Sequence, residues 1–100
     1  MSGDRVRTLE KLYTQGETSD IVDLALEKLL AYELRESQRQ LARLVRDLSW
    51  FEQQYDMSSD AFYGRFQAGE MGDAMDFVEW ASLHQMAERL KRRIGLLEES

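Results

Sequence analysis

Apolar residues recur at intervals of three and four along almost the whole chain, which is the spacing of one face of an α-helix. Strong helix formers dominate long stretches, and the sequence contains no proline. The pattern predicts four helices: residues 4–15, ended by Gly16; a long helix from about residue 19 to 55; a short helix capped by Ser58 and ended near Gly69; and a last helix from about residue 73–76 to 97. We therefore expect an all-α fold with two short and two long helices.

The long second helix carries two different apolar patterns. Between residues 21 and 34 it is apolar on several sides, which predicts burial against more than one neighbour and association with a second copy of the chain. The candidate dimerisation residues are Ile21, Val22, Leu26, Leu29, Leu30 and Leu34. Further along, the pattern narrows to a heptad seam typical of a coiled coil or a helical hairpin. That seam comprises Leu34, Ser37, Leu41, Leu44, Leu48, Phe51 and Tyr55.

The last helix carries a matching apolar line, so we expect it to fold back along the second half of the long helix as a helical hairpin. The line comprises Phe77, Trp80, Leu83, Ala87, Leu90, Ile94 and Leu97. A chain of 100 residues fits one small domain. We predict that residues 1–100 form a single helical domain, in which about residues 4–50 dimerise and about residues 51–98 bind a partner. The expected assembly is a homodimer or a higher even oligomer.

The excess negative charge lies in one segment of the chain. Residues 52–79 contain seven carboxylates and one base, Arg65, and this local balance of −6 equals the formal charge of the whole chain. Large aromatic residues interleave with the carboxylates, a composition that suits capture of a basic protein surface. The candidate partner-binding residues are Asp56, Asp60, Tyr63, Glu70, Asp73, Asp76, Glu79 and Trp80.

A second interpretation of this segment is open: it could be a solvated connector whose aromatics belong to the core. Phe62 and Phe66 share one helical face, and Trp80 lies on the seam, so packing is the favoured role for all three. Asp73 and Asp76 are suited to capping the last helix and to its dipole. Tyr63 projects from another face and is the better contact candidate.

The sequence favours a protein without catalytic residues, cofactor or metal. It has no cysteine, no glycine-rich phosphate loop, and a single histidine, His84, which we expect at the surface or half-buried. No apolar run approaches the ~18 residues of a membrane span, and we expect a cytoplasmic protein that does not contact membranes. With a net charge of −6, we expect no DNA binding by the chain alone.

Two parts of the chain resemble known families. Residues 16–30 look like the second helix of a ribbon-helix-helix domain, but only residues 1–5 precede the first helix, too few for that fold's DNA-reading strand. Residues 55–80 resemble small prokaryotic antitoxins of type II toxin-antitoxin pairs. The shared features are Met57-Ser58, Phe62-x-x-x-Phe66, Gly69-Glu70-x-Gly72-Asp73 and Asp76-Phe77-x-Glu79-Trp80.

The second resemblance implies an antitoxin that neutralises a basic, usually RNA-cleaving toxin by steric and electrostatic occlusion. The alternative is a structural coiled-coil or helical adaptor with no toxin partner.

Overall fold

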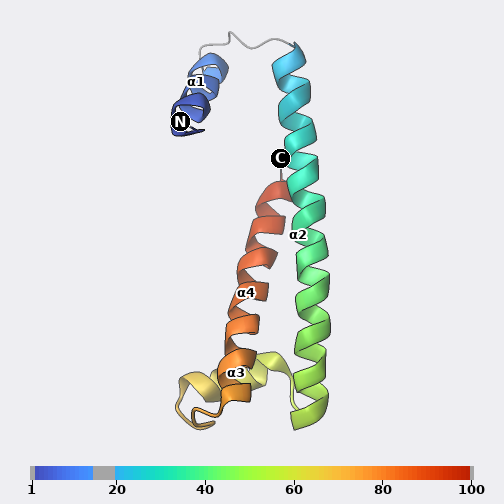
Figure 1. Ribbon diagram of the computed structural model, residues 1–100, viewed down its shortest axis with the longest axis vertical. Coiled ribbons are helices and arrows are strands. Elements are labelled where there is room, and N and C mark those ends of the chain that lie inside the picture. Colours follow the sequence, from blue (N-terminus) through green and yellow to red (C-terminus); the bar gives the residue numbers. More distant parts are fainter. Residues whose placement is uncertain (1, 15–19, 100) are drawn as a thin grey trace. The chain divides into compact units, whose positions relative to one another are not determined.

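The computed structural model describes residues 2–14 and 20–99, and this part of the chain is all-α, as predicted (Figure 1). It contains four helices and no strand: α1 (Ser2–Thr14), α2 (Asp20–Tyr55), α3 (Ser59–Gln67) and α4 (Met75–Glu98). The bounds agree with the sequence pattern to within a few residues. The predicted stop at Gly16 and the caps at Thr18 or Ser19 lie outside the described residues.

The chain divides into two compact units, Met1–Ala31 and Tyr32–Ser100, and the boundary falls within α2. In the first unit, α1 and the start of α2 leave large apolar side chains exposed to solvent. Val6 is 54% exposed and Ile21 is 79% exposed. The second unit is the predicted helical hairpin, and it includes residues 32–55 of α2.

In the second unit, α4 runs back along the second half of α2, and α3 lies at the closed end (Figure 1). The predicted seam is the buried face of α2, where Ser37, Leu44, Leu48 and Phe51 are all less than a tenth exposed. The facing line of α4 buries Trp80, Ala87 and Ile94. The three-four spacing works because it keeps each apolar line on one side of its helix over several turns.

Stacked aromatic rings form the core at the closed end. Phe62 and Trp80 are both fully buried, with ring centroids 3.9 Å apart and nearly parallel planes. Phe51 stacks on the same indole at 5.6 Å. These large rings fix α2, α3 and α4 together, because each ring belongs to a different helix.

The turns at the closed end follow the predicted chemistry. The Ser58 side chain accepts a hydrogen bond from the backbone N–H of Ala61 at 3.1 Å, which caps α3 as expected. Gly69 and Gly72 have φ values of 77° and 76°, in the left-handed region that glycine enters at little cost. Asp56 also has a positive φ, 51°, directly after the end of α2. None of the described helices is both long enough and apolar enough to cross a membrane.

Candidate functional site

Two of the seven carboxylates in residues 52–79 are used inside the hairpin. One carboxylate oxygen of Glu52 accepts hydrogen bonds from the backbone N–H of Ser59 at 2.9 Å and from its hydroxyl at 2.7 Å. Asp76 accepts a hydrogen bond from the Tyr55 hydroxyl at 2.6 Å. That hydrogen bond, with smaller effects of burial and the Asp76 charge, raises the pKa of Tyr55 above its usual 10.0.

Ser59 relays a hydrogen-bond chain from the core to α2. The indole N–H of Trp80 donates to the Ser59 hydroxyl at 2.9 Å, and that hydroxyl donates to Glu52. Ser59 is 6% exposed and Trp80 is fully buried, so the indole donor has little access to water. The chain therefore ties α2, α3 and α4 at one point and satisfies the polar end of the buried indole.

The other five carboxylates are exposed to solvent, although Asp60 also lies 3.7 Å from the His84 imidazole, and we call this set the acidic end. It comprises Asp56, Asp60, Glu70, Asp73 and Glu79. They belong to the turn after α2, to α3, to the α3–α4 connection and to the start of α4, all at the closed end of the hairpin (Figure 1). Asp73 does not cap α4: the N-cap is Ala74, which makes no side-chain capping hydrogen bond. Capping of α4 therefore does not occupy the carboxylates of the acidic end.

The aromatic candidates divide differently. Trp80 is fully buried, as its place on the apolar line of the last helix predicted, so it offers no contact surface. Tyr63 is half-buried; its hydroxyl accepts a hydrogen bond from the Gln85 side chain at 2.6 Å. The ring of Tyr63 remains at the surface of α3 and stays a candidate contact.

An exposed tryptophan that the sequence reasoning did not select lies next to the acidic end. Trp50 is 52% exposed and lines an open cleft of about 290 Å³ together with Asp47 and Glu79. Phe51 and Leu83 complete the lining, and the rings of Trp50 and Phe51 meet edge to face at 4.9 Å. The cleft combines an aromatic face with two carboxylates, a suitable seat for a cationic side chain.

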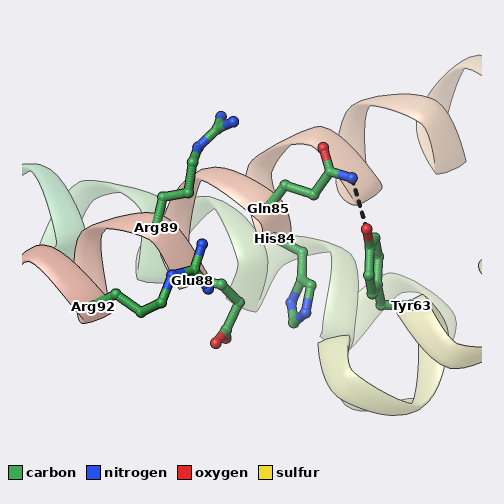
Figure 2. A pocket seen from close by; sticks show the side chains of 6 residues that line it. All are labelled: Tyr63, His84, Gln85, Glu88, Arg89 and Arg92. Atoms are coloured by element: carbon green, nitrogen blue, oxygen red, sulfur yellow. Dashed lines mark hydrogen bonds between the residues drawn. The ribbon is translucent and has the colours of Figure 1, made fainter.

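A second cleft, of about 400 Å³, has the opposite character. Tyr63, His84 and Gln85 line one part, and Glu88, Arg89 and Arg92 of α4 line the rest (Figure 2). The two guanidinium groups outnumber the one carboxylate, so this cleft does not suit a basic partner. The acidic end and the Trp50 cleft carry the opposite charge balance.

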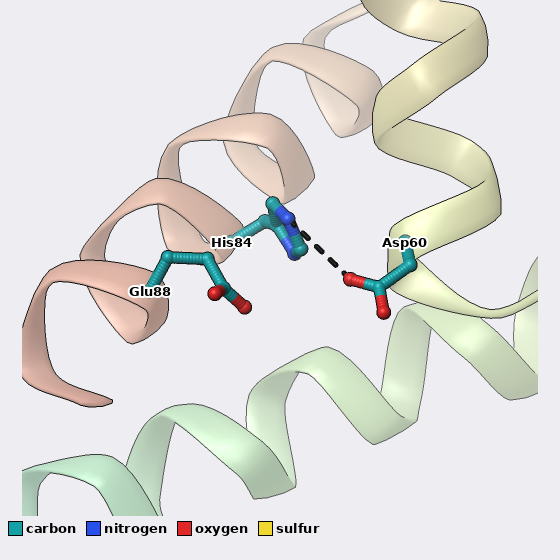
Figure 3. A group of neighbouring side chains, drawn as sticks. All are labelled: Asp60, His84 and Glu88. Atoms are coloured by element: carbon teal, nitrogen blue, oxygen red, sulfur yellow. Dashed lines mark ion pairs between the residues drawn. The ribbon is translucent and has the colours of Figure 1, made fainter. Parts of the chain in front are cut away.

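The prediction that His84 is at the surface or half-buried is wrong, because its side chain is only 9% exposed. Tyr63 covers it, with ring centroids 4.6 Å apart. Figure 3 shows His84 between Asp60 of α3 and Glu88, one turn further along α4. The spacing of His84 and Glu88 was visible in the sequence, but the approach of Asp60 required the packing of α3 on α4.

The candidate dimerisation residues are mostly open to solvent in the single chain. Ile21 and Leu29 are 79% and 59% exposed, and Leu30 is 39% exposed. Val22, Leu26 and Leu34 are intermediate. The apolar surface on the first half of α2 is thus available to a second copy.

Comparison of the chain with protein-family models, with curated proteins and with solved structures finds no match in any of the three. The function must therefore be argued from the site itself.

Proposed function

We propose that this protein is an antitoxin-like inhibitor that binds a basic partner protein through the acidic end of its hairpin. The observation that carries the proposal is the fate of the seven carboxylates in residues 52–79. The fold consumes two of them and leaves five exposed at one end. A concentrated negative surface attracts a basic protein and speeds its association.

The backbone conformation of Asp56 supports a functional role for its carboxylate. Its φ of 51° lies in the region where glycine is favoured and where most side chains are strained. Aspartate tolerates that conformation better than most residues. Among the described contacts, however, the Asp56 side chain makes no capping hydrogen bond that would explain why aspartate and not glycine stands at this position. An exposed charge at this turn is useful if a partner reads it.

The Trp50 cleft supplies the second element that a protein-binding surface needs. Charged rims govern association, whereas a well-packed anchor slows dissociation. A lysine or arginine of the partner would place its cation against the Trp50 ring and between Asp47 and Glu79. The proposed contact surface is therefore the acidic end continued through Glu79 into this cleft.

The resemblance of residues 55–80 to antitoxins gives the proposed partner a chemical identity. An RNA-cleaving toxin needs a basic surface to hold the phosphate backbone of its substrate. An acidic inhibitor that covers this surface blocks it both sterically and by charge. A neighbouring gene that encodes a small basic protein would supply the partner to test.

The experiment is a binding titration against that gene product, with association and dissociation measured separately. A variant with Asp56→Asn, Asp60→Asn, Glu70→Gln and Glu79→Gln should associate with the partner at least about tenfold more slowly than the parent protein does at low salt. The difference should shrink at about 1 M salt, where the Debye length is only about 3 Å. Helix content should not change, because these four side chains are exposed.

A matched control separates local from overall charge. Glu10, Glu27, Glu98 and Glu99 are also exposed but lie outside the acidic end. Changing these four to Gln alters the net charge by the same amount and should leave association close to that of the parent. If both variants slow association equally, the effect is one of overall charge and the proposed surface is wrong.

The anchor is tested by Trp50→Ala, which should accelerate dissociation, corresponding to a loss of about 2 kcal/mol of binding free energy. Tyr63→Ala tests the remaining aromatic candidate of the sequence in the same way. Unchanged dissociation for Trp50→Ala would exclude the cleft as the anchor.

The second candidate function, a structural helical adaptor, is favoured by the exposed apolar side chains on the first half of α2. Ile21 and Leu29 are more than half exposed, as an assembly surface would be. Pull-down from the native host distinguishes the two functions. An adaptor would bring down only copies of itself or acidic-to-neutral partners, whereas the antitoxin-like protein would bring down a small basic protein.

A further inference from the structure

We propose that Asp60, His84 and Glu88 form a binding site for a divalent transition-metal ion, of which Zn²⁺ is the representative. One potential ligand atom from each residue lies within 4.8 Å of the other two. Figure 3 shows the imidazole of His84 facing the carboxylate of Asp60, with the Glu88 carboxylate beside it on α4. The inference does not depend on the proposed partner binding.

The state of His84 is the observation that distinguishes this cluster from an ordinary group of surface carboxylates. Its side chain is more than nine-tenths buried, and its Nε2 lies 3.7 Å from Oδ1 of Asp60, too far for a hydrogen bond. Among the described contacts, no hydrogen bond to the ring is formed. No buried side-chain nitrogen or oxygen of the described residues lacks a hydrogen-bond partner, so the ring nitrogens of His84 reach the solvent of the cleft, where a metal ion can approach them.

The geometry is open to a metal after small side-chain movements. Zn²⁺ holds nitrogen and oxygen ligands at about 2.0–2.2 Å, so neighbouring ligand atoms must approach to roughly 3.3 Å. The buried imidazole provides the fixed ligand. The Asp60 and Glu88 side chains are 89% and 39% exposed, so both can rotate toward it. The three residues also line one cleft of about 170 Å³, which leaves room for a water as the fourth ligand.

The donor set determines the class of metal. An imidazole nitrogen with two carboxylates suits Zn²⁺ and its transition-metal neighbours, whereas Mg²⁺ prefers oxygen ligands and retains its water. Lys91 also lines the cleft, and its ammonium group donates to Glu88 at 3.1 Å. This ammonium competes with a metal for the carboxylate and must swing aside, which its 55% exposure allows.

The test uses the full, tag-free chain, in which His84 is the only histidine. Its imidazole signals in an NMR spectrum therefore report on this site alone. Addition of one equivalent of ZnCl₂ should shift these signals, and calorimetry should give one Zn²⁺ per chain. MgCl₂ at the same concentration should do neither. Unshifted signals with Zn²⁺, or an equal response to Mg²⁺, would overturn the assignment.

Paired variants on α4 locate the ligands. Glu88→Gln should weaken Zn²⁺ binding at least about tenfold, because even residues behind the ligands are worth roughly 10- to 100-fold in metal affinity. The exposed Glu98 lies on the same helix outside the cleft, so Glu98→Gln should not change the affinity. Asp60→Asn repeats the test from α3. Equal affinities for Glu88→Gln and Glu98→Gln would contradict the site.

Lys91 offers a test in the opposite direction. Lys91→Gln should tighten Zn²⁺ binding because it frees Glu88 and removes the competing cation. Arg65→Gln removes the same charge at an exposed position outside this cleft, and it should have a smaller effect. If the two variants tighten binding equally, only the overall charge matters and Lys91 does not compete at the site.

Discussion

Replacing Ser59 with alanine should destabilise the hairpin more than replacing the neighbouring Ser58, although Ser58 is the helix cap. Ser59 is 6% exposed and its hydroxyl joins the buried indole N–H of Trp80 to the carboxylate of Glu52. Ser58 makes one hydrogen bond to a backbone N–H at an exposed site. The two substitutions remove the same atom from adjacent residues, so they compare a buried relay with a solvent-exposed cap.

The expected magnitudes follow from what each substitution leaves behind. Without the Ser59 hydroxyl, the indole N–H has no acceptor in a fully buried side chain, a loss of about 1–3 kcal/mol, and Glu52 loses one charge-assisted hydrogen bond. Loss of an N-cap costs about 1 kcal/mol. Glu52 keeps its bond to the Ser59 backbone N–H in the variant, so α3 should still form. We expect Ser59→Ala to be the more damaging by about 1–2 kcal/mol.

Urea unfolding followed by far-ultraviolet circular dichroism measures both free energies. A double-mutant cycle with Trp80→Phe then isolates the relay, because phenylalanine stacks in the core but has no N–H to leave unpaired. In that background Ser59→Ala should become less damaging by about 1 kcal/mol. The reasoning fails if Ser58→Ala is equally damaging, or if Ser59→Ala costs the same in both backgrounds.

Three further predictions concern the turn, the assembly surface and pH. Asp56→Gly should raise the free energy of unfolding by up to about 1 kcal/mol by relieving the positive φ, yet slow partner association, while Asp56→Asn should slow association without that gain. Leu30→Asp should halve the mass measured by light scattering if the first half of α2 pairs with a second copy, because a buried, unpaired carboxylate is strongly destabilising; an unchanged mass refutes pairing there. At pH values below 10, Tyr55→Phe should lower the thermal midpoint of unfolding relative to the parent protein. This difference in midpoint should shrink as the pH rises through the raised pKa of Tyr55, since ionised Tyr55 repels Asp76. A difference that stays constant to higher pH would contradict this.

The helices and their buried faces could be predicted because the information is periodic and local. The seam from Ser37 to Phe51 and the line from Trp80 to Ile94 each repeat over several turns, so one misplaced residue does not change the result. Ser58 predicted the start of α3 for a similar reason, since a cap acts on the residues directly after it.

The site was less predictable because it depends on contacts between helices. Glu52 looked like one more acidic surface residue, and only the approach of Ser59 gives it an internal role. Trp50 lies outside the seam of α2, directly before the inward-facing Phe51. Its position beside Glu79 depends on where α4 begins, which the spacing along α2 does not predict. His84 lies four residues after Trp80 and three before Ala87, so its spacing places it on the buried face of α4, and only its contact with Tyr63 depends on the packing of α3.

These internal contacts also bear on how the proposed surface would bind. The stacked rings of Phe62 and Trp80 and the Ser59 relay fix the three helices from which the exposed carboxylates project. A surface fixed in this way loses little conformational entropy when a partner arrives. Neutralising its charges should then change mainly the association rate, and removing the Trp50 anchor should change mainly the dissociation rate. If weakening the relay by Ser59→Ala lowers partner affinity while every exposed carboxylate is intact, the ordered arrangement of the charges matters as well as their number.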